Sequence, residues 1–257
     1  MTVLKATDVR KTFVLSQKQQ KINKTHDKLK VALAGVSFEA YAGEIYGLLG
    51  PNGAGKTTMM RIISTLIKPD AGDVTVMGHS IRNAPDEVRK NIAFLTSELK
   101  LEDFFTPNYI YDFYSNLHNI PADVRAERKN KLFDKFGIDK FCEVKVGELS
   151  TGMKQKVSIA VSLAHNPGVI VYDEPTNGLD IITAKIVTDF LLDLKSQGKC
   201  IIVSTHIFSL IEKVCDRVGI IIEGSMVADD TLENICGVKT LEDVFFDIYY
   251  AAGGERA

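Results

Sequence analysis

The pattern of hydrophobic and polar positions in the first forty residues differs from the pattern in the rest of the chain. The first forty residues alternate with period two, which predicts strands over 3–9 and 31–40. Later apolar runs of strand length are separated by helical segments, and they lie at 45–49, 169–172, 200–204 and 218–222. Because parallel strands need crossover connections, this alternation predicts a largely parallel sheet with crossover helices.

Helical spacing of apolar residues predicts the helices. Met60, Ile63 and Ile67 predict a helix over 57–66. Thr106 followed by Pro107 is typical of a helix start, with Thr106 as the N-cap and Pro107 as the first helical residue. Pro121 opens a second predicted helix that reaches residue 136. Since no strand pattern occurs between residues 99 and 166, this stretch predicts an all-helical insertion into an α/β domain.

Residues 16–30 are rich in lysine and nearly free of apolar side chains. This composition predicts an exposed insertion, a solvated hairpin or loop. The alternative is a cationic arm that reaches a partner or lipid headgroups.

Composition limits the classes of function. The 257 residues are 45% hydrophobic and 25% charged, which indicates one or two folded domains and excludes disorder. A formal net charge of -2 gives no global attraction to nucleic acid, so no nucleic-acid partner is expected. No apolar run approaches the roughly 18 residues of a membrane-spanning helix, and the start lacks the apolar core of a secretory signal, so a cytoplasmic protein is expected. The four cysteines form no CxxC pair, which favours reduced thiols over disulfides or a zinc site.

A phosphate-binding loop is predicted at residues 50–57. Their sequence, Gly-Pro-Asn-Gly-Ala-Gly-Lys-Thr, satisfies G-x-x-x-x-G-K-[ST] between a predicted strand and a predicted helix. The glycines let backbone N–H groups turn inward around a β-phosphate, and the helix points its positive end at the same anion. Lys56 adds a charge on the β- and γ-phosphates, and the Thr57 hydroxyl is the expected Mg²⁺ ligand.

Two adjacent carboxylates, Asp173 and Glu174, follow the strand at 169–172. Asp173 is expected to hold Mg²⁺ through water, and Glu174 to act as general base or to polarise the attacking water. An isolated Asp-Glu pair would more readily be two solvated turn residues. Together with the phosphate loop, the pair predicts the second half of a nucleotide-hydrolysing site.

Three further segments complete a recognisable series. Residues 149–155 read Leu-Ser-Thr-Gly-Met-Lys-Gln, residues 178–180 read Gly-Leu-Asp, and His206 follows the strand at 200–204. With the phosphate loop, this series resembles the nucleotide-binding subunit of an ABC transporter, over about residues 3–235. The resemblance implies an α/β fold: a P-loop NTPase core with a mixed, largely parallel sheet, an N-terminal antiparallel β region and an inserted helical subdomain.

The domain boundaries expected from this resemblance describe one nucleotide-binding domain over 1–257. The ATP-binding core would take 1–96 and 167–235, the helical subdomain 97–166, and a C-terminal helical tail 236–257.

The resemblance also assigns residues to ATP and to a second subunit. Two chains would sandwich two ATP molecules head to tail, as an ATP-dependent homodimer, with the signature of each chain facing its partner's nucleotide. His206 would contact the γ-phosphate and Phe13 would stack on adenine, although a structural histidine and a core aromatic remain alternatives. The catalytic set is Glu174, His206 and Lys56; the ATP-binding set is Phe13, Gly50, Pro51, Asn52, Gly53, Ala54, Gly55, Lys56, Thr57 and Thr58; the signature set is Ser150, Thr151, Gly152 and Met153.

Two departures from the family pattern stand out. The signature has Thr151 and Met153 where the family has glycine and glutamine, but the serine and second glycine remain, so activity is expected to survive. The family's Mg²⁺-contacting glutamine is missing. By register Ser97 takes its place beside Glu98, which makes Ser97 a candidate third metal residue with Thr57 and Asp173.

Within the family, the sequence most resembles subunits of bacterial export systems, in particular those of sodium-efflux ABC transporters. The resemblance implies a polytopic membrane subunit on a separate chain and a peripheral location on the cytoplasmic side of the cell membrane. The groove that receives the membrane subunit is expected between the Ser97 segment and the helix after Pro107. Its apolar residues are Leu101, Phe104, Phe105, Tyr109 and Tyr111. For about half of them, ordinary core packing is the alternative.

Other classes of protein fit this sequence less well. A soluble ABC-type ATPase not coupled to transport is the main alternative, but such proteins usually carry two cassettes or a long coiled-coil insertion. A P-loop kinase or GTPase would lack residues 149–155 and His206. An inactive regulatory subunit would be expected to lose Lys56 or Glu174, and both are present.

Overall fold

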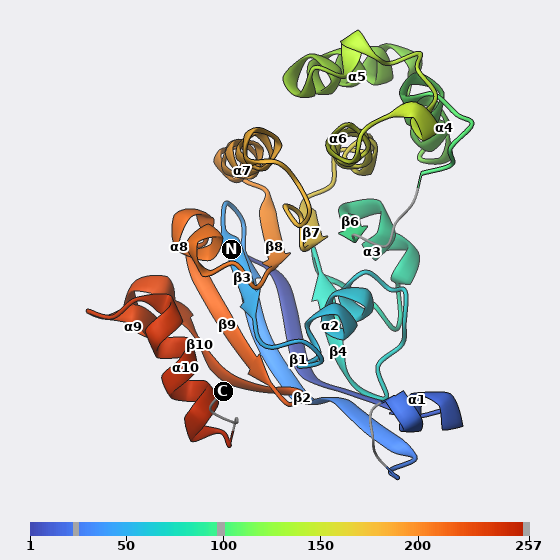
Figure 1. Cartoon of the computed structure of the whole chain (residues 1–257). Coiled ribbons are helices and arrows are strands. Elements are labelled where there is room, and N and C mark those ends of the chain that lie inside the picture. Colours follow the sequence, from blue (N-terminus) through green and yellow to red (C-terminus); the bar gives the residue numbers. More distant parts are fainter. Residues whose placement is uncertain (23–25, 97–100, 254–257) are drawn as a thin grey trace.

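The computed structural model describes residues 1–22, 26–96 and 101–253 (Figure 1). Its first sheet is antiparallel, with the order β2-β1-β4-β5. The strands are β1 (Thr2–Val14), β2 (Leu29–Tyr41), β4 (Ala71–Val76) and β5 (His79–Ser80). The prediction of a hairpin or loop over 16–30 is wrong in part, because this segment contains the short helix α1 (Gln17–Ile22) and β2 already begins at Leu29.

The second sheet has the order β10-β9-β3-β8-β7-β6. All of its strand pairs are parallel except β10 with β9, which confirms the predicted largely parallel sheet. The strands are β3 (Ile45–Leu49), β6 (Ile92–Thr96), β7 (Val169–Asp173), β8 (Cys200–Ser204), β9 (Arg217–Ile222) and β10 (Ser225–Thr231).

Helices lie between most of these strands along the chain, whereas β10 directly follows β9, and α4, α5 and α6 gather at one end of the molecule (Figure 1). The predicted start of α4 is confirmed: Pro107 is its first residue, and the Thr106 hydroxyl accepts a hydrogen bond from the Tyr109 N–H at 3.2 Å. Helix α2 is shorter than predicted, since it ends at Ile63. The helices are α2 (Lys56–Ile63), α3 (Pro85–Asn91), α4 (Pro107–Leu117), α5 (Ala122–Phe136), α6 (Thr151–Ser162), α7 (Ile181–Ser196), α8 (Phe208–Val214), α9 (Leu232–Cys236) and α10 (Leu241–Ala251), with short 3-10 turns at Ile138–Lys140 and Val146–Glu148.

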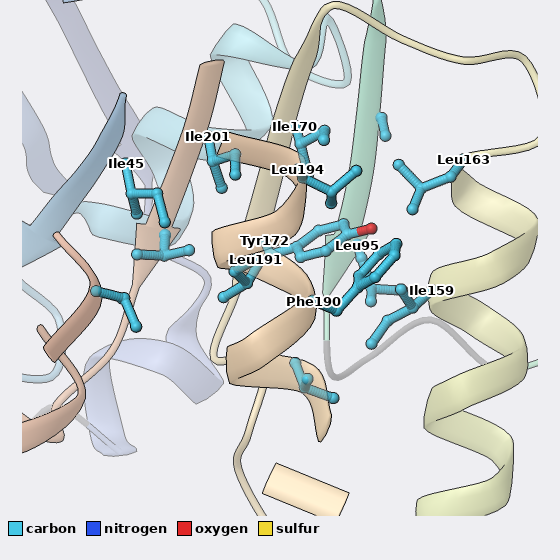
Figure 2. Packing of buried hydrophobic residues seen from close by; sticks show 14 of the residues in the cluster. Ile45, Leu95, Ile159, Leu163, Ile170, Tyr172, Phe190, Leu191, Leu194 and Ile201 are labelled. Atoms are coloured by element: carbon cyan, nitrogen blue, oxygen red, sulfur yellow. The ribbon is translucent and has the colours of Figure 1, made fainter. Parts of the chain in front are cut away.

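Both faces of the parallel sheet are buried, which explains why its strands are continuous apolar runs. Side chains alternate along a strand, so Ile170 and Tyr172 of β7 enter a core shared with α6 and α7, where Phe190 packs (Figure 2). Val169 and Val171 enter a second core shared with α2 and the antiparallel sheet. The sheet is thereby fixed from both sides, and the loops at its carboxyl edge have a rigid base.

The cysteines are free thiols, as predicted: Cys200 and Cys215 are buried, and Cys142 and Cys236 are partly buried. Burial raises the pKa of the Cys200 thiol to about 12. Within the described ranges, none of the helices is both long enough and apolar enough to cross a membrane.

A pair of histidines links two helical ends to the sheet. The rings of His118, after α4, and His165, after α6, are stacked with centroids 4.1 Å apart. The His165 Nε2–H donates to the carbonyl oxygen of Ile92 at 3.0 Å. Burial, with a smaller effect of His118, lowers the pKa of His165 from 6.5 to about 4, so the folded chain holds this ring neutral.

We therefore expect acid to destabilise the chain through His165. As the pH falls from about 6.5 to about 4, the unfolded chain binds a proton that the folded chain resists, so up to about 3 kcal/mol of stability is lost in that window. Urea unfolding at several pH values should show a flatter pH dependence for His165→Gln than for the wild type. His26→Gln, an exposed control, should keep the wild-type slope. If the free energy of unfolding depended equally on pH in all three proteins, His165 would not be the source of the acid destabilisation.

Candidate nucleotide-binding site

The loop between β3 and α2 wraps around the side chain of Lys56. The Lys56 ammonium donates to the carbonyl oxygen of Gly50 at 2.7 Å and to that of Pro51 at 3.2 Å. Burial lowers the pKa of Lys56, and the nearby carboxylates of Glu174 and Asp173 oppose that shift. A cation is thus held at the start of α2, where N–H groups also face an incoming anion.

Two glycines of this loop are required by close backbone contacts. A Cβ at Gly50 would collide with the carbonyl oxygen of Ile221, in β9. A Cβ at Gly55 would collide with the carbonyl oxygen of Ala32, in β2, and Gly55 also has a φ of 113°. The loop therefore fits between strands of both sheets only because these residues lack side chains.

Asp173 lies where three strands end side by side. In the strand register, Thr96 of β6 pairs with Asp173 of β7, which pairs with Ser204 of β8. One oxygen of Asp173, Oδ2, accepts from the Thr57 hydroxyl at 2.8 Å, and the other, Oδ1, accepts from the Ser204 hydroxyl. The two predicted halves of the site are therefore joined by the Thr57–Asp173 hydrogen bond.

Glu174 turns away from the strand in a strained conformation. Its φ of 54° is left-handed, and its N–H donates to the carbonyl oxygen of Ser204 at 3.0 Å. Its Oε1 lies 3.0 Å from the Nδ1 of His206, while its Oε2 is buried with no hydrogen-bond partner among the described residues. A buried carboxylate oxygen without a partner is costly unless a ligand or water contacts it.

Many of these groups line a pocket of about 360 Å³; His206 contacts Glu174 but does not itself line the pocket. The predicted residues that line it are Phe13, Asn52, Gly53, Gly55, Lys56, Thr57, Thr58, Asp173 and Glu174. Phe13 lines the pocket with 37% of its surface exposed, beneath the Lys11 ammonium at 5.5 Å, so it is not a core aromatic. Gly50, Pro51 and Ala54 do not line the pocket; the carbonyl oxygens of Gly50 and Pro51 accept from the Lys56 ammonium instead.

Some lining residues were missed from the sequence. Lys30 and Ala32 of β2 and Thr96 of β6 line the pocket, and Ser204 holds Asp173. Lys30 pairs directly with Phe13 across β1 and β2, so only a correct strand register could have revealed it. Ser204 was visible as the last residue of a predicted strand, without a motif to mark it.

The signature residues lie apart from this pocket. The Ser150 hydroxyl caps α6 by accepting from the Met153 N–H at 3.3 Å, and Thr151 is exposed at the first turn. A Cβ on Gly152 would lie 3.1 Å from the Thr183 hydroxyl, so α6 starts beside the start of α7. The four signature residues are therefore together, but none of them lines the chain's own nucleotide pocket.

The expected apolar groove is only partly present on the surface. Tyr111 is fully buried against Phe133 and Leu101 packs against the core, so for these two residues the alternative of core packing is correct. Phe104, Phe105 and Tyr109 are exposed, and the rings of Phe105 and Tyr109 stack at 4.5 Å. The predicted roles of Ser97 and Glu98 lie outside the described residues.

Comparison with known proteins identifies the class. Residues 33–177 match the ABC transporter family, and the chain belongs to that family. It is 37% identical over 221 residues to the ABC transporter ATP-binding protein NatA of Bacillus subtilis (strain 168), which covers 85% of this chain and 90% of that protein. It is 31% identical over 217 residues to the linearmycin resistance ATP-binding protein LnrL of the same organism, covering 84% and 70%.

A solved structure of an ATP-binding cassette also resembles this chain. The ATP-binding cassette MJ0796, in a dimeric post-hydrolysis state bound to ADP and Pi, matches with a TM-score of 0.77 at 26% identity, covering 89% of this chain and 98% of that one. The P-loop NTPase fold is thereby confirmed. The chain is an ABC-type ATP-binding subunit, and ATP hydrolysis is the activity of its family.

We expect Lys56→Ala to weaken ATP binding at least about tenfold, because charged hydrogen bonds contribute about 1.5–3 kcal/mol each and tenfold corresponds to 1.4 kcal/mol. Titration calorimetry with ATP measures this. Lys68→Ala, which removes an exposed lysine beyond the end of α2, is the matched control and should bind as the wild type does. Unchanged affinity in Lys56→Ala would remove Lys56 from the binding set.

Proposed function

We propose that this chain powers export through a membrane subunit on a separate chain, by Mg²⁺-dependent ATP hydrolysis at two sites formed between two copies of itself. The observation that carries the proposal is the incomplete site of one chain. The pocket has the phosphate loop, Asp173 and Glu174, but the signature Ser150–Met153 is outside it. A second copy placed head to tail supplies that signature to the γ-phosphate.

The donor set of the pocket fits Mg²⁺. The Thr57 hydroxyl and the Asp173 carboxylate already touch, and hard oxygen donors together with phosphate and water are what this ion prefers. Thr57 would bind it directly and Asp173 through water; when bound, Mg²⁺ neutralises charge on the β- and γ-phosphate oxygens. The part expected of Ser97 remains a prediction.

The catalytic roles follow from the geometry of Glu174. Its Oε2, which has no hydrogen-bond partner within the described part of the chain, is the group that can accept a proton from an attacking water, in the role of general base. His206 orients this carboxylate by donating from Nδ1 to Oε1, and in its protonated form, with hydrogen on both ring nitrogens, it can also donate from Nε2 to a γ-phosphate oxygen. Lys56 holds the phosphates, while the exposed face of Phe13 offers a stacking surface for adenine.

The relatives support both the dimer and the direction of transport. The cassette MJ0796 is dimeric in its ADP and Pi complex. LnrL is named for resistance to linearmycin, and such resistance fits an export role. Export of sodium ions by this chain stays a prediction, since nothing in the pocket contacts a cargo and selectivity would lie in the membrane subunit.

The membrane subunit is proposed to dock on the exposed aromatic face of α4 and the residues before it. These residues are Phe104, Phe105, Tyr109, Phe113, Tyr114 and Leu117, and their rings form a continuous series of contacts from Phe104 to Tyr114. Contiguous exposed aromatics are characteristic of interaction surfaces. Docking there would hold the chain peripherally on the cytoplasmic side of the cell membrane.

We expect Glu174→Gln to trap an ATP-bound dimer. The substitution keeps the side chain's shape but removes the base, so hydrolysis should fall at least about a hundredfold while ATP binding persists. Size-exclusion chromatography with ATP and Mg²⁺ should show the doubled mass. Glu233→Gln, an exposed control on α9, should hydrolyse ATP normally. A Glu174→Gln protein that binds ATP yet stays monomeric at every ATP concentration would contradict the shared site.

We expect the double variant Tyr109→Ala/Phe113→Ala to lose attachment to membranes of the native cell. Both side chains are about half exposed, at 51% and 47%, so their removal should leave the basal ATPase rate within about twofold. Leu66→Ala, which removes a side chain that is 61% exposed elsewhere, is the control. If the double variant and the wild type sediment equally with membranes, α4 is not the docking face; if neither sediments, the soluble ATPase becomes the better interpretation.

A further inference from the structure

A second cavity, of about 320 Å³, lies between α5, the α6–β7 connection and α7. It shares no lining residue with the nucleotide pocket. Its apolar floor is formed by Leu132, Leu163, Pro167, Phe190 and Leu194. Its charged rim is formed by Arg128, Lys131, Lys135 and Lys199, with Glu127 and Asp193 as the acidic members.

The rim carries a net positive charge that its own carboxylates do not neutralise. Lys135 is paired with Asp193. Lys199 donates to the side-chain oxygen of Asn166 at 2.7 Å, and Arg128 donates to the carbonyl oxygen of Ala164 at 3.2 Å, so both cations are bonded to neutral acceptors.

Partial burial of these two side chains makes the arrangement less favourable without an anion. It lowers the pKa of Lys199, and the charge of Arg128 adds to the effect. Removing a cation from water is compensated by a counter-ion with good hydrogen-bond geometry. Arg128 comes from α5 and Lys199 from the residue before β8, so one anion between them would join the helical segment to the sheet.

We propose that this cavity binds a small organic anion, a phosphate or carboxylate carried on an apolar body. The fork of Arg128 and the ammonium of Lys199 contact the acidic group, and the floor around Leu163 accepts the apolar part. The volume is at the lower end of the roughly 300–1,000 Å³ of small-molecule sites, which fits a single ring or short chain. Because the ligand contacts α5 and the start of β8 together, binding stabilises the folded chain.

The probe for this site is phenyl phosphate, with phenol as its uncharged counterpart. The protein is first saturated with ADP and Mg²⁺, so that the phosphate loop is occupied. Titration calorimetry should show phenyl phosphate binding at least about tenfold more tightly than phenol. Arg128→Gln and Lys199→Gln should each weaken phenyl phosphate at least about tenfold, whereas Lys140→Gln, an exposed control on the same helical segment, should bind within about twofold of the wild type.

A second measurement does not depend on the variants. In the wild type, phenyl phosphate should shift the methyl resonances of Leu132, Leu163 and Leu194, and leave that of Leu66 unchanged. The proposal is overturned if phenyl phosphate does not bind, if it binds with these resonances unshifted, or if Arg128→Gln and Lys199→Gln bind it normally. Sedimentation with phosphatidic acid vesicles that requires Arg128 and Lys199, without binding of phenyl phosphate, would replace the small anion by a lipid headgroup.

Discussion

The arrangement of the site depends on the two hydrogen bonds that fix the carboxylate of Asp173. The Thr57 hydroxyl binds it from the start of α2, and the Ser204 hydroxyl binds it from the end of β8. The carboxylate is buried at the edge of a sheet whose faces are both covered, so it has little freedom to move. The phosphate loop and the strand ends, which are far apart in sequence, thereby keep one geometry.

The strain at Glu174 follows from this rigid edge. After Asp173 is fixed, the next residue has to leave the sheet and still point its side chain into the pocket, and the left-handed φ of 54° accomplishes this turn. Such a conformation costs of order 1–3 kcal/mol for a residue other than glycine. The N–H bond to the carbonyl of Ser204 stabilises it, so β8 supports both acidic residues.

Sequence reasoning predicted the parts of the molecule that depend on local spacing. The phosphate loop, Asp173 and Glu174 were found because a motif and a strand end mark them. Lys30 was missed because it reaches the pocket only through the pairing of β1 with β2. Tyr111 was expected in a docking groove, with core packing left open as the alternative. It is buried, because its face of α4 packs against Phe133, which helical spacing alone does not reveal.

The signature and the catalytic turn of one chain are also connected to each other. The Gln155 side chain, on α6, donates to the carbonyl oxygen of Pro175 at 3.2 Å, directly after Glu174. Asp180 caps α7 through the N–H of Thr183 at 3.0 Å, and Gly152 lies against the same threonine. In the proposed dimer, α6 faces the partner's nucleotide while Glu174 faces its own. If the partner's nucleotide displaced α6, the displacement would act on the turn that positions Glu174 at the chain's own nucleotide. In that dimer these short contacts would couple the two sites without a long conformational pathway.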